Sequence, residues 1–209
     1  MPTQRDWLNS WRGLGVNNND LLVPVHAQIV DRYNEKHRCY HTLRHLEECF
    51  EHWASVRSTT SHPAEVEVAL WFHDAIYDTR RNDNEQRSAN WAREIALLAA
   101  VSMEASQRIF DLIMYTRHAV QQPVGADAQT LIDIDLAILG ADSDRFVEYE
   151  DQIRREYSWV PDNDFQKARF AILNEFLKRE HIYFTSWFRD RYETRARDNI
   201  GQSLETLTV

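Results

Sequence analysis

Apolar side chains recur every three or four residues along almost the whole chain, which is the spacing of one face of an α-helix. Leu43, Leu46, Phe50 and Trp53 show the pattern clearly, because all four fall on one side of a helix over residues 42–56. The same pattern marks nine segments, which cover residues 23–33, 42–56, 64–75, 83–98, 106–118, 128–139, 143–157, 161–178 and 185–207. The sequence therefore predicts an all-α protein, a compact bundle of about nine or ten helices.

Residues that favour helix ends separate these segments. Pro63 stands where a helix would begin, and Gly140 stands just beyond the end of another, which are the positions that each residue prefers. No linker, internal repeat or low-complexity segment interrupts the 209 residues. We therefore predict a single domain over residues 1–209, with a core over about 25–185 and a C-terminal helix over about 185–207.

Composition narrows the class of protein further. Hydrophobic residues make up 43% of the chain, and no apolar run approaches the roughly 18 residues of a membrane span. The N-terminal residues are polar and lack the apolar core of a signal peptide. A formal charge of −9 argues against binding a nucleic-acid polymer, which needs a basic surface. We predict a cytoplasmic protein that binds neither membranes nor nucleic-acid polymers, with Cys39 and Cys49 reduced.

The most informative chemistry is the adjacent pair His73–Asp74, which directly follows the apolar run over residues 66–72. Burying an unpaired carboxylate at such a place is unfavourable, and a divalent cation would remove that penalty. Imidazole nitrogen and carboxylate oxygen together suit manganese, iron, zinc or magnesium. The competing interpretation is an aspartate that caps a helix or pairs with an arginine.

Two more groups of ligand-type side chains flank this pair in the sequence. Upstream, His41 and His45 are four residues apart, so a helix would place them on one face. Downstream, Asp133 and Asp135 lie in an almost wholly apolar segment, and on a helix they would point in different directions. One histidine and one aspartate are therefore expected to reach the ion, while the others act as neighbours, caps or surface groups.

The order His … His-Asp … Asp is the ligand order of the HD superfamily of metal-dependent phosphohydrolases, which this chain resembles. It is similar in particular to the branch described as predicted metal-dependent HD phosphohydrolases. The segments that carry the resemblance are residues 40–45, 71–78, 84–89, 134–140, 153–157 and 193–199. The resemblance implies an ion held by His45, His73, Asp74 and Asp135, with Asp133 as the alternative to Asp135. The cofactor would be one divalent ion of Mn, Mg, Fe, Co, Ni or Zn, with a second ion left open.

Further residues near these motifs are candidates for catalysis and substrate binding. Glu85 or Asp78 would accept the proton of a metal-bound water, and His118 would protonate the leaving oxygen. Glu85 also suits the first turn of a helix for electrostatic reasons alone, so both interpretations stay open. The candidates for substrate binding are His41, Arg44, Arg117 and Ser88.

These expectations describe a metal-dependent phosphohydrolase that acts on a small phosphorylated metabolite or nucleotide through a metal-activated water. One alternative is a di-iron oxygenase of the HD type, for which His41 and His118 would be additional ligands. Another is a non-catalytic, nucleotide-binding regulatory module. A purely structural protein is the third, with its tryptophans forming a core or a dimer surface. A homodimer is left open.

Overall fold

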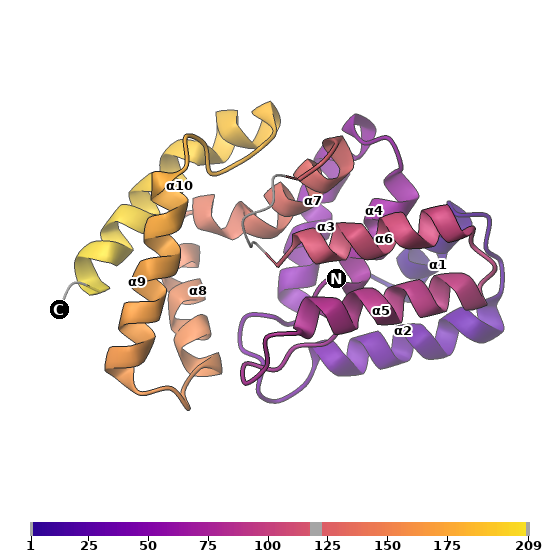
Figure 1. Cartoon of the computed structure of the whole chain (residues 1–209), viewed down its shortest axis with the longest axis horizontal. Helices are drawn as coiled ribbons and strands as arrows, with labels where there is room; N and C mark the ends of the chain where they lie inside the picture. The colour runs from indigo at the N-terminus through magenta and orange to yellow at the C-terminus, as the bar shows by residue number, and fades with distance from the viewer. Residues whose placement is uncertain (1, 118–122, 208–209) are drawn as a thin grey trace. The chain divides into compact units, whose positions relative to one another are not determined.

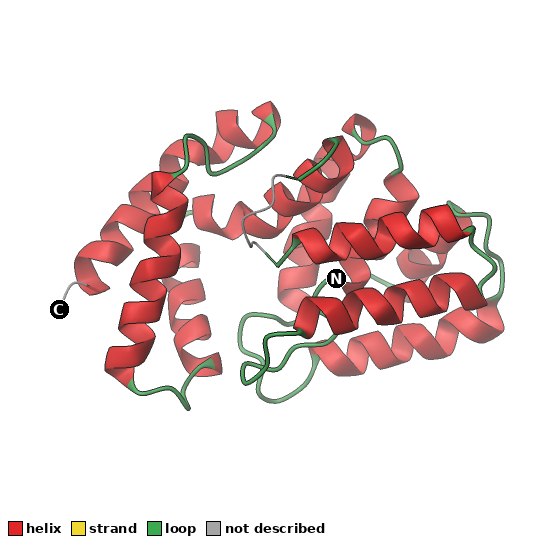
Figure 2. Ribbon diagram, in the orientation of Figure 1, coloured by secondary structure: helices red, strands yellow, loops and turns green. Residues whose placement is uncertain are grey.

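The computed structural model describes residues 2–117 and 123–207, and this part of the chain is helical without any strand (Figures 1 and 2). The described residues form ten α-helices and two short 3-10 helices, η1 and η2. Their bounds are α1 Gln4–Arg12, α2 Asn19–Tyr33, α3 Leu43–Val56, η1 Arg57–Thr59, α4 Pro63–Phe72, α5 Asn84–Leu98, α6 Met103–Tyr115, α7 Ala126–Asp135, η2 Leu136–Gly140, α8 Ser143–Glu156, α9 Asp162–Lys178 and α10 Ser186–Leu207. The predicted all-α fold is confirmed. None of the described helices combines the length and the apolar character of a membrane span.

Helix α1 is the one α-helix that the apolar pattern does not predict. The helix begins with a capping box, in which the Thr3 hydroxyl accepts from the Asp6 amide and the Asp6 carboxylate accepts from the Thr3 amide. Trp7 and Trp11 are both fully buried. The buried face of α1 consists only of these two tryptophans and the small Ser10. With so few apolar residues, the helical spacing of apolar positions cannot be recognised in the sequence.

Some predicted helix ends are wrong by several residues. Helix α4 ends at Phe72 and not near Ala75, and the residues that follow form turns. Helix α6 begins at Met103, three residues early, because the Ser102 hydroxyl accepts from the amide of Ala105 at 3.2 Å and caps the helix there. The segment predicted as one helix over 128–139 is divided into α7 and η2.

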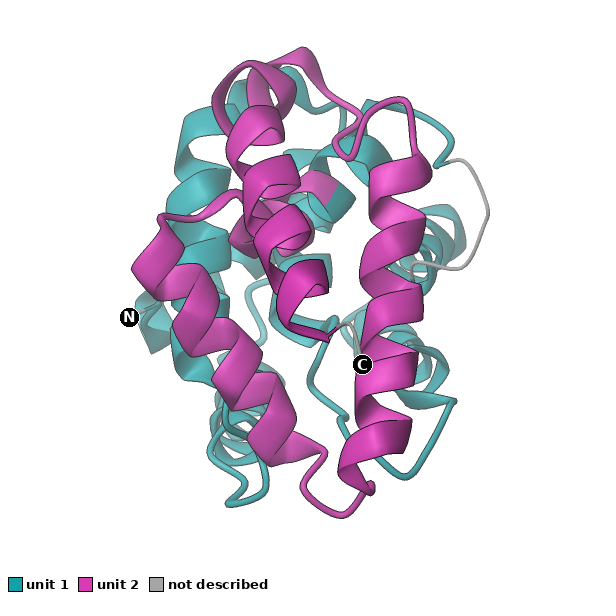
Figure 3. Ribbon diagram, turned by 90° about the vertical axis from the view of Figure 1, so that its left-hand side faces the viewer, with its two compact units in different colours: residues 1–132 teal, residues 133–209 magenta. Residues whose placement is uncertain are grey.

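The chain divides into two compact units, Met1–Ile132 and Asp133–Val209, which Figure 3 shows in separate colours. The boundary falls within α7. The single domain expected over residues 1–209 stays a prediction, and each unit is described by itself.

Helix α4 forms the centre of the first unit and packs against α1, α3, α5 and α6. Its residues are apolar on all sides, as expected for a helix that other helices surround. The exceptions are Glu65 and Glu67. Glu65 is buried and accepts two hydrogen bonds from Arg108 of α6, at 2.6 and 2.8 Å, and Glu67 accepts one from Trp53 at 3.0 Å. Helices α5 and α6 lie side by side (Figure 1). This packing fixes the end of α4, where His73 and Asp74 follow.

The tryptophans serve mainly as core residues. Trp7 and Trp71 make an edge contact with ring centroids 5.5 Å apart, and Phe72 contacts Trp91 at 5.2 Å. Trp71 is fully buried, whereas Trp159 of the second unit is 45% exposed. The aromatic residues therefore form much of the core of the first unit.

In the second unit, η2 packs against α8 and α10. A Cβ atom on Gly140 would lie 2.7 Å from the Cβ and the carbonyl oxygen of Tyr192, so only glycine allows this approach. Asn199 of α10 donates to the carbonyls of Leu139 and Ala141, both at 2.9 Å. These contacts hold η2 firmly against α10.

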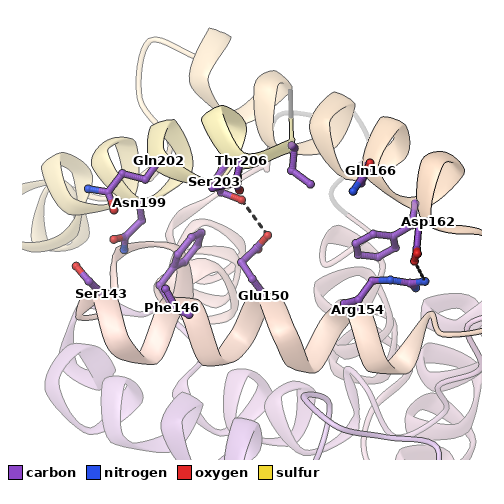
Figure 4. Close-up of a pocket in the computed structure, with 13 residues that line it drawn as sticks. Ser143, Phe146, Glu150, Arg154, Asp162, Gln166, Asn199, Gln202, Ser203 and Thr206 are labelled. Carbon is purple, nitrogen blue, oxygen red and sulfur yellow. Dashed lines mark hydrogen bonds and ion pairs between the residues drawn. The ribbon is translucent and has the colours of Figure 1, made fainter. Parts of the chain in front are cut away.

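The second unit also contains a cavity of about 490 Å³ between α8, α9 and α10 (Figure 4). Phe146 and Phe165 contribute apolar walls. The charged lining residues are occupied within the unit, because Glu150 accepts from Ser203 at 3.0 Å and Arg154 pairs with Asp162 at 2.5 Å. The cavity therefore combines apolar walls with charged groups that already have partners in the same unit.

Candidate metal centre

The first unit brings three of the predicted metal ligands together, and we call His45, His73 and Asp74 the His/Asp cluster. His45 lies in the first turn of α3, which begins after the N-cap Thr42. His73 and Asp74 directly follow α4, and α3 packs against α4. The ends of two neighbouring helices thus present the three side chains to one point.

The ligand atoms of the cluster lie within hydrogen-bonding or ion-pair distance of one another. The Nε2 atoms of His45 and His73 are 3.1 Å apart. Oδ2 of Asp74 lies 3.3 Å from Nε2 of His73 and 3.5 Å from Nε2 of His45. Both histidines are almost completely buried, and the Asp74 side chain is 17% exposed. These atoms could hold a metal ion.

The three separations match those of ligands around a single ion. Two adjacent ligands bound at about 2.0–2.2 Å stand about 2.8–3.6 Å apart in tetrahedral or octahedral geometry. The observed 3.1, 3.3 and 3.5 Å all fall within that interval. The cluster therefore has the dimensions of a metal site before any side chain moves.

A backbone contact orients the ring of His73. Its Nδ1 lies 2.7 Å from the carbonyl oxygen of Leu70, which can only accept a hydrogen bond. Nδ1 therefore carries the proton, and in the neutral ring Nε2 keeps a lone pair that faces the cluster. Metal-binding histidines are commonly held in this way by a carbonyl or carboxylate on the other nitrogen.

The electrostatics of the cluster keep Asp74 ionised. Burial is the largest single influence and acts to raise the pKa of Asp74. In their protonated forms, His73 and His41 act against burial through their charge, and His45 and His73 do so by donating hydrogen bonds to the carboxylate. Together these interactions hold the pKa of Asp74 well below its usual range. At neutral pH the cluster therefore offers the negative charge that a divalent cation needs.

Cys49 also lies beside the cluster, one turn beyond His45 on α3. It is a free, buried cysteine, and its Sγ lies 3.7 and 3.8 Å from the two ring nitrogens of His45. The sulfur also belongs, with His45 and His73, to a second group of atoms that could hold a metal ion. The thiol packs on His45, while Nε2 of His45 faces His73 and Asp74.

The segment that follows the cluster, residues 74–78, is held by side chains along its whole length. Each of its five carbonyl oxygens is within hydrogen-bond distance of a side chain from outside the segment. Arg38 contacts the carbonyl oxygens of Asp74 and Ala75, and Ser88 contacts the carbonyl oxygen of Ile76. His37 contacts the carbonyl oxygen of Tyr77, and Asn84 contacts the carbonyl oxygen of Asp78. Helix α4 has ended here, so these side chains replace the backbone hydrogen bonds of a helix. The segment is fixed although it has no regular secondary structure.

His41 lies next to the cluster. The sequence predicts that a helix carries both His41 and His45, but His41 is not on α3. It precedes the N-cap Thr42, and its ring centroid is 5.9 Å from that of His45. The ring stacks on Tyr77 with centroids 4.0 Å apart. The expected helix does not reach back to residue 41, because the Thr42 hydroxyl accepts from the Arg44 amide and starts the helix at that point.

The two candidate aspartates of the second unit differ clearly in their surroundings. Asp133 is fully buried, and its carboxylate accepts from the amides of Phe184 and Thr185 and from the Thr185 hydroxyl, all at 2.7 Å. Burial raises the pKa of Asp133 to about 6, against these hydrogen bonds, which act to lower it. Asp133 thus anchors the chain just before α10. Asp135 is the last residue of α7 and half-buried, and its part as the fourth ligand stays a prediction.

These surroundings separate the effects of two substitutions. Asp133→Asn is expected to lower the stability of the protein by about 1–3 kcal/mol. The NH2 group of the asparagine side chain would face one of the donors that now bind the carboxylate, and that donor would lose its acceptor. The substitution should leave metal affinity unchanged. Asp135→Asn is expected to weaken metal binding severely, because a neutral amide is a poorer ligand for hard cations than a carboxylate. Thermal melting and calorimetric metal titration measure the two effects, and the reverse ranking in the titration would make Asp133 the ligand.

Two of the remaining predicted site residues, Asp78 and Ser88, make hydrogen bonds with the backbone. Asp78 lies in a loop and not one helical turn beyond Asp74, and its carboxylate accepts from the Arg80 amide at 2.9 Å. The buried Ser88 hydroxyl accepts from the Ile76 amide at 3.0 Å, which is a structural contact. The catalytic part of Asp78 and the substrate contact of Ser88 stay predictions.

Glu85 is in the first turn of α5 and makes no hydrogen bond or ion pair with another described residue. Arg44 pairs with Glu48 at 3.3 Å and remains half exposed. Arg117 is exposed and donates to the carbonyl of Asn82 at 3.5 Å. His118 lies outside the described residues.

Sequence reasoning missed the side chains that hold the segment after the cluster, except Ser88, which it named as a substrate-binding candidate and not as a structural contact. Arg38 and His37 directly precede the motif at residues 40–45, and Asn84 and Ser88 belong to the motif at residues 84–89. The first pair gave no signal, because neither lies in a periodic apolar segment. The second pair has the four-residue spacing of one helix face, which would have placed both against a common segment.

Comparisons with protein-family models, with curated proteins and with solved structures found no match.

Proposed function

We propose that this protein is a metal-dependent phosphohydrolase that acts on a small phosphorylated metabolite or nucleotide. The observation that carries the proposal is the convergence of His45, His73 and the ionised Asp74 at ligand separations. Three side chains leave further positions on an ion, for Asp135, for water and for a phosphate oxygen. The resemblance of the motifs to the HD superfamily supports hydrolysis as the reaction.

Each candidate residue has a definite task in this reaction. A bound divalent ion would lower the pKa of a coordinated water and neutralise charge that develops on phosphorus. Glu85 is the favoured acceptor of the water's proton, because its carboxylate makes no hydrogen bond or ion pair with another described residue. Arg44 and Arg117 would hold phosphate oxygens, and His118 would give a proton to the leaving oxygen.

The place of Glu85 in the structure supports this assignment. Asn84, its neighbour, donates to the Asp78 carbonyl at 2.9 Å and accepts from the Asp78 amide at 3.1 Å. One turn later, Ser88 bonds to Ile76. The first turn of α5 is therefore tied to the segment that begins with the ligand Asp74.

The test is metal analysis of the purified full-length chain, followed by a phosphate-release screen over nucleotides and sugar phosphates. Mn²⁺, Mg²⁺, Co²⁺ and Ni²⁺ are added separately. We expect release that requires a divalent ion and stops when a chelator removes it. Bound metal with no release from any compound would favour the regulatory module. Bound iron with oxygen consumption would favour the oxygenase.

A further inference from the structure

The guanidinium group of Arg38 has every N–H donor occupied by the protein itself. Its Nη1 donates to the carbonyls of Asp74 at 2.6 Å and His41 at 3.2 Å. Its Nη2 donates to Ala75 and Glu35, and its Nε donates to Glu35, at 3.1–3.2 Å. An arginine has five N–H donors, so none remains for a substrate phosphate. Arg38 therefore acts on the cluster by holding other residues and not by binding the substrate.

Two of the carbonyls that Arg38 binds, those of Asp74 and Ala75, lie just beyond the end of α4. The last carbonyls of a helix lack intrahelical donors, and that end favours a positive charge. From the loop between α2 and α3, Arg38 places its positive charge near this helix end and donates to the two carbonyls that follow it. It thereby fixes the backbone of Asp74 directly beside His73, and it ties that backbone to the carbonyl of His41.

The arginine itself is held rigidly. Its side chain is fully buried, with its charge balanced by Glu35 at 3.1 Å. The Tyr33 and Tyr77 rings lie 5.3 and 5.6 Å from the guanidinium carbon, close enough for cation–π attraction. A group that is buried, paired and held between two rings can set a backbone position within narrow limits.

We propose that Arg38 is a positioning residue of the metal centre: by holding the backbone carbonyls of Asp74 and Ala75 directly after α4, it sets the Asp74 carboxylate at binding distance from the two histidines. The inference rests on the metal centre of the proposed function, although not on which reaction occurs there. Asp74 lies beyond the hydrogen-bonding pattern of α4, so without Arg38 its carbonyl has no donor from the helix. Lysine cannot replace Arg38, because one ammonium group cannot reach the same spread of acceptors.

The experiment is calorimetric titration of the full-length protein with Mn²⁺ for Arg38→Lys and Arg38→Gln. We expect the affinity for Mn²⁺ to fall about 10- to 100-fold in both variants, the usual effect of removing a group that orients a metal ligand. The control is Arg108→Gln, which also removes an arginine paired with a buried acid of the first unit, Glu65. It should lower the melting temperature and change the affinity by less than about twofold.

Glu35→Gln provides a milder variant in case the Arg38 variants do not fold. The Glu35 side chain is 27% exposed, and its substitution leaves Arg38 without its counter-charge. We expect a fall in Mn²⁺ affinity of about 3- to 10-fold, smaller than that for loss of the whole orienting group. Unchanged affinity in folded Arg38 variants, or in Glu35→Gln, would overturn the inference. Wild-type protein that binds no metal would overturn both proposals, whereas metal binding without phosphate release would contradict only the proposed function.

Discussion

Replacement of Asp74 by alanine is expected to lower metal affinity by at least about 100-fold and to abolish phosphate release. A change of an orienting neighbour already costs 10- to 100-fold in metal affinity, so loss of a ligand must exceed that. The carboxylate also supplies the negative charge of the His/Asp cluster. His73→Ala should have the same effect on metal, with an additional loss of stability, because His73 is 1% exposed and its removal leaves a cavity.

A second histidine–aspartate pair of the first unit provides the control. His62 and Asp127 lie 2.9 Å apart, with side chains 45% and 16% exposed, and they belong to no metal cluster of the described residues. Asp127→Ala should leave metal affinity and phosphate release unchanged. Circular dichroism and calorimetric titration, applied to all the variants, separate loss of the site from loss of the fold. Full metal occupancy in Asp74→Ala would show that the pair has been assigned wrongly.

The fold was predictable because its signal is repeated in every helix. Apolar residues at helical spacing indicate nine segments without any knowledge of what each one contacts. Helix α1 shows where this reasoning ends, because its burial depends on Trp7 and Trp11 meeting Trp71 and Phe72, which are distant in the sequence. The end of α4 was missed for a related reason. Nothing in residues 73–75 stops a helix, but Arg38 binds the carbonyls at residues 74 and 75.

The candidate ligands could be predicted in part, because a histidine and an aspartate beside a buried helix are unusual as surface residues. That argument identified His73 and Asp74, and the motif order added His45. It could not decide between Asp133 and Asp135, because both have apolar neighbours in the sequence. The three hydrogen bonds to Asp133 come from residues about fifty positions away. Such long-range partners determine whether a buried acid is structural or available to an ion.

Replacement of Glu85 by glutamine is expected to lower kcat by about two to four orders of magnitude, the usual effect of removing a general base. Metal affinity and KM should stay nearly unchanged, because glutamine keeps the shape of the side chain but cannot accept the water's proton. The structural alternative is that Glu85 only stabilises the start of α5 through the helix dipole. Its carboxylate caps no described residue, so that alternative predicts a loss of about 0.3–1 kcal/mol and an unchanged rate.

Glu94 on the same helix allows the two interpretations to be compared directly. It is exposed and far from the first turn of α5, so Glu94→Gln changes the same charge on the same helix without touching the residues that bond to Ile76 and Asp78. Steady-state kinetics and thermal melting on both variants decide the matter. A fall in kcat for Glu85→Gln alone, at equal metal occupancy, assigns proton transfer to Glu85. Equal rates in both variants would leave Glu85 as a helix residue and transfer the role of proton acceptor to Asp78. The Asp78 carboxylate would then have to give up its hydrogen bond from the Arg80 amide before it accepts the water's proton.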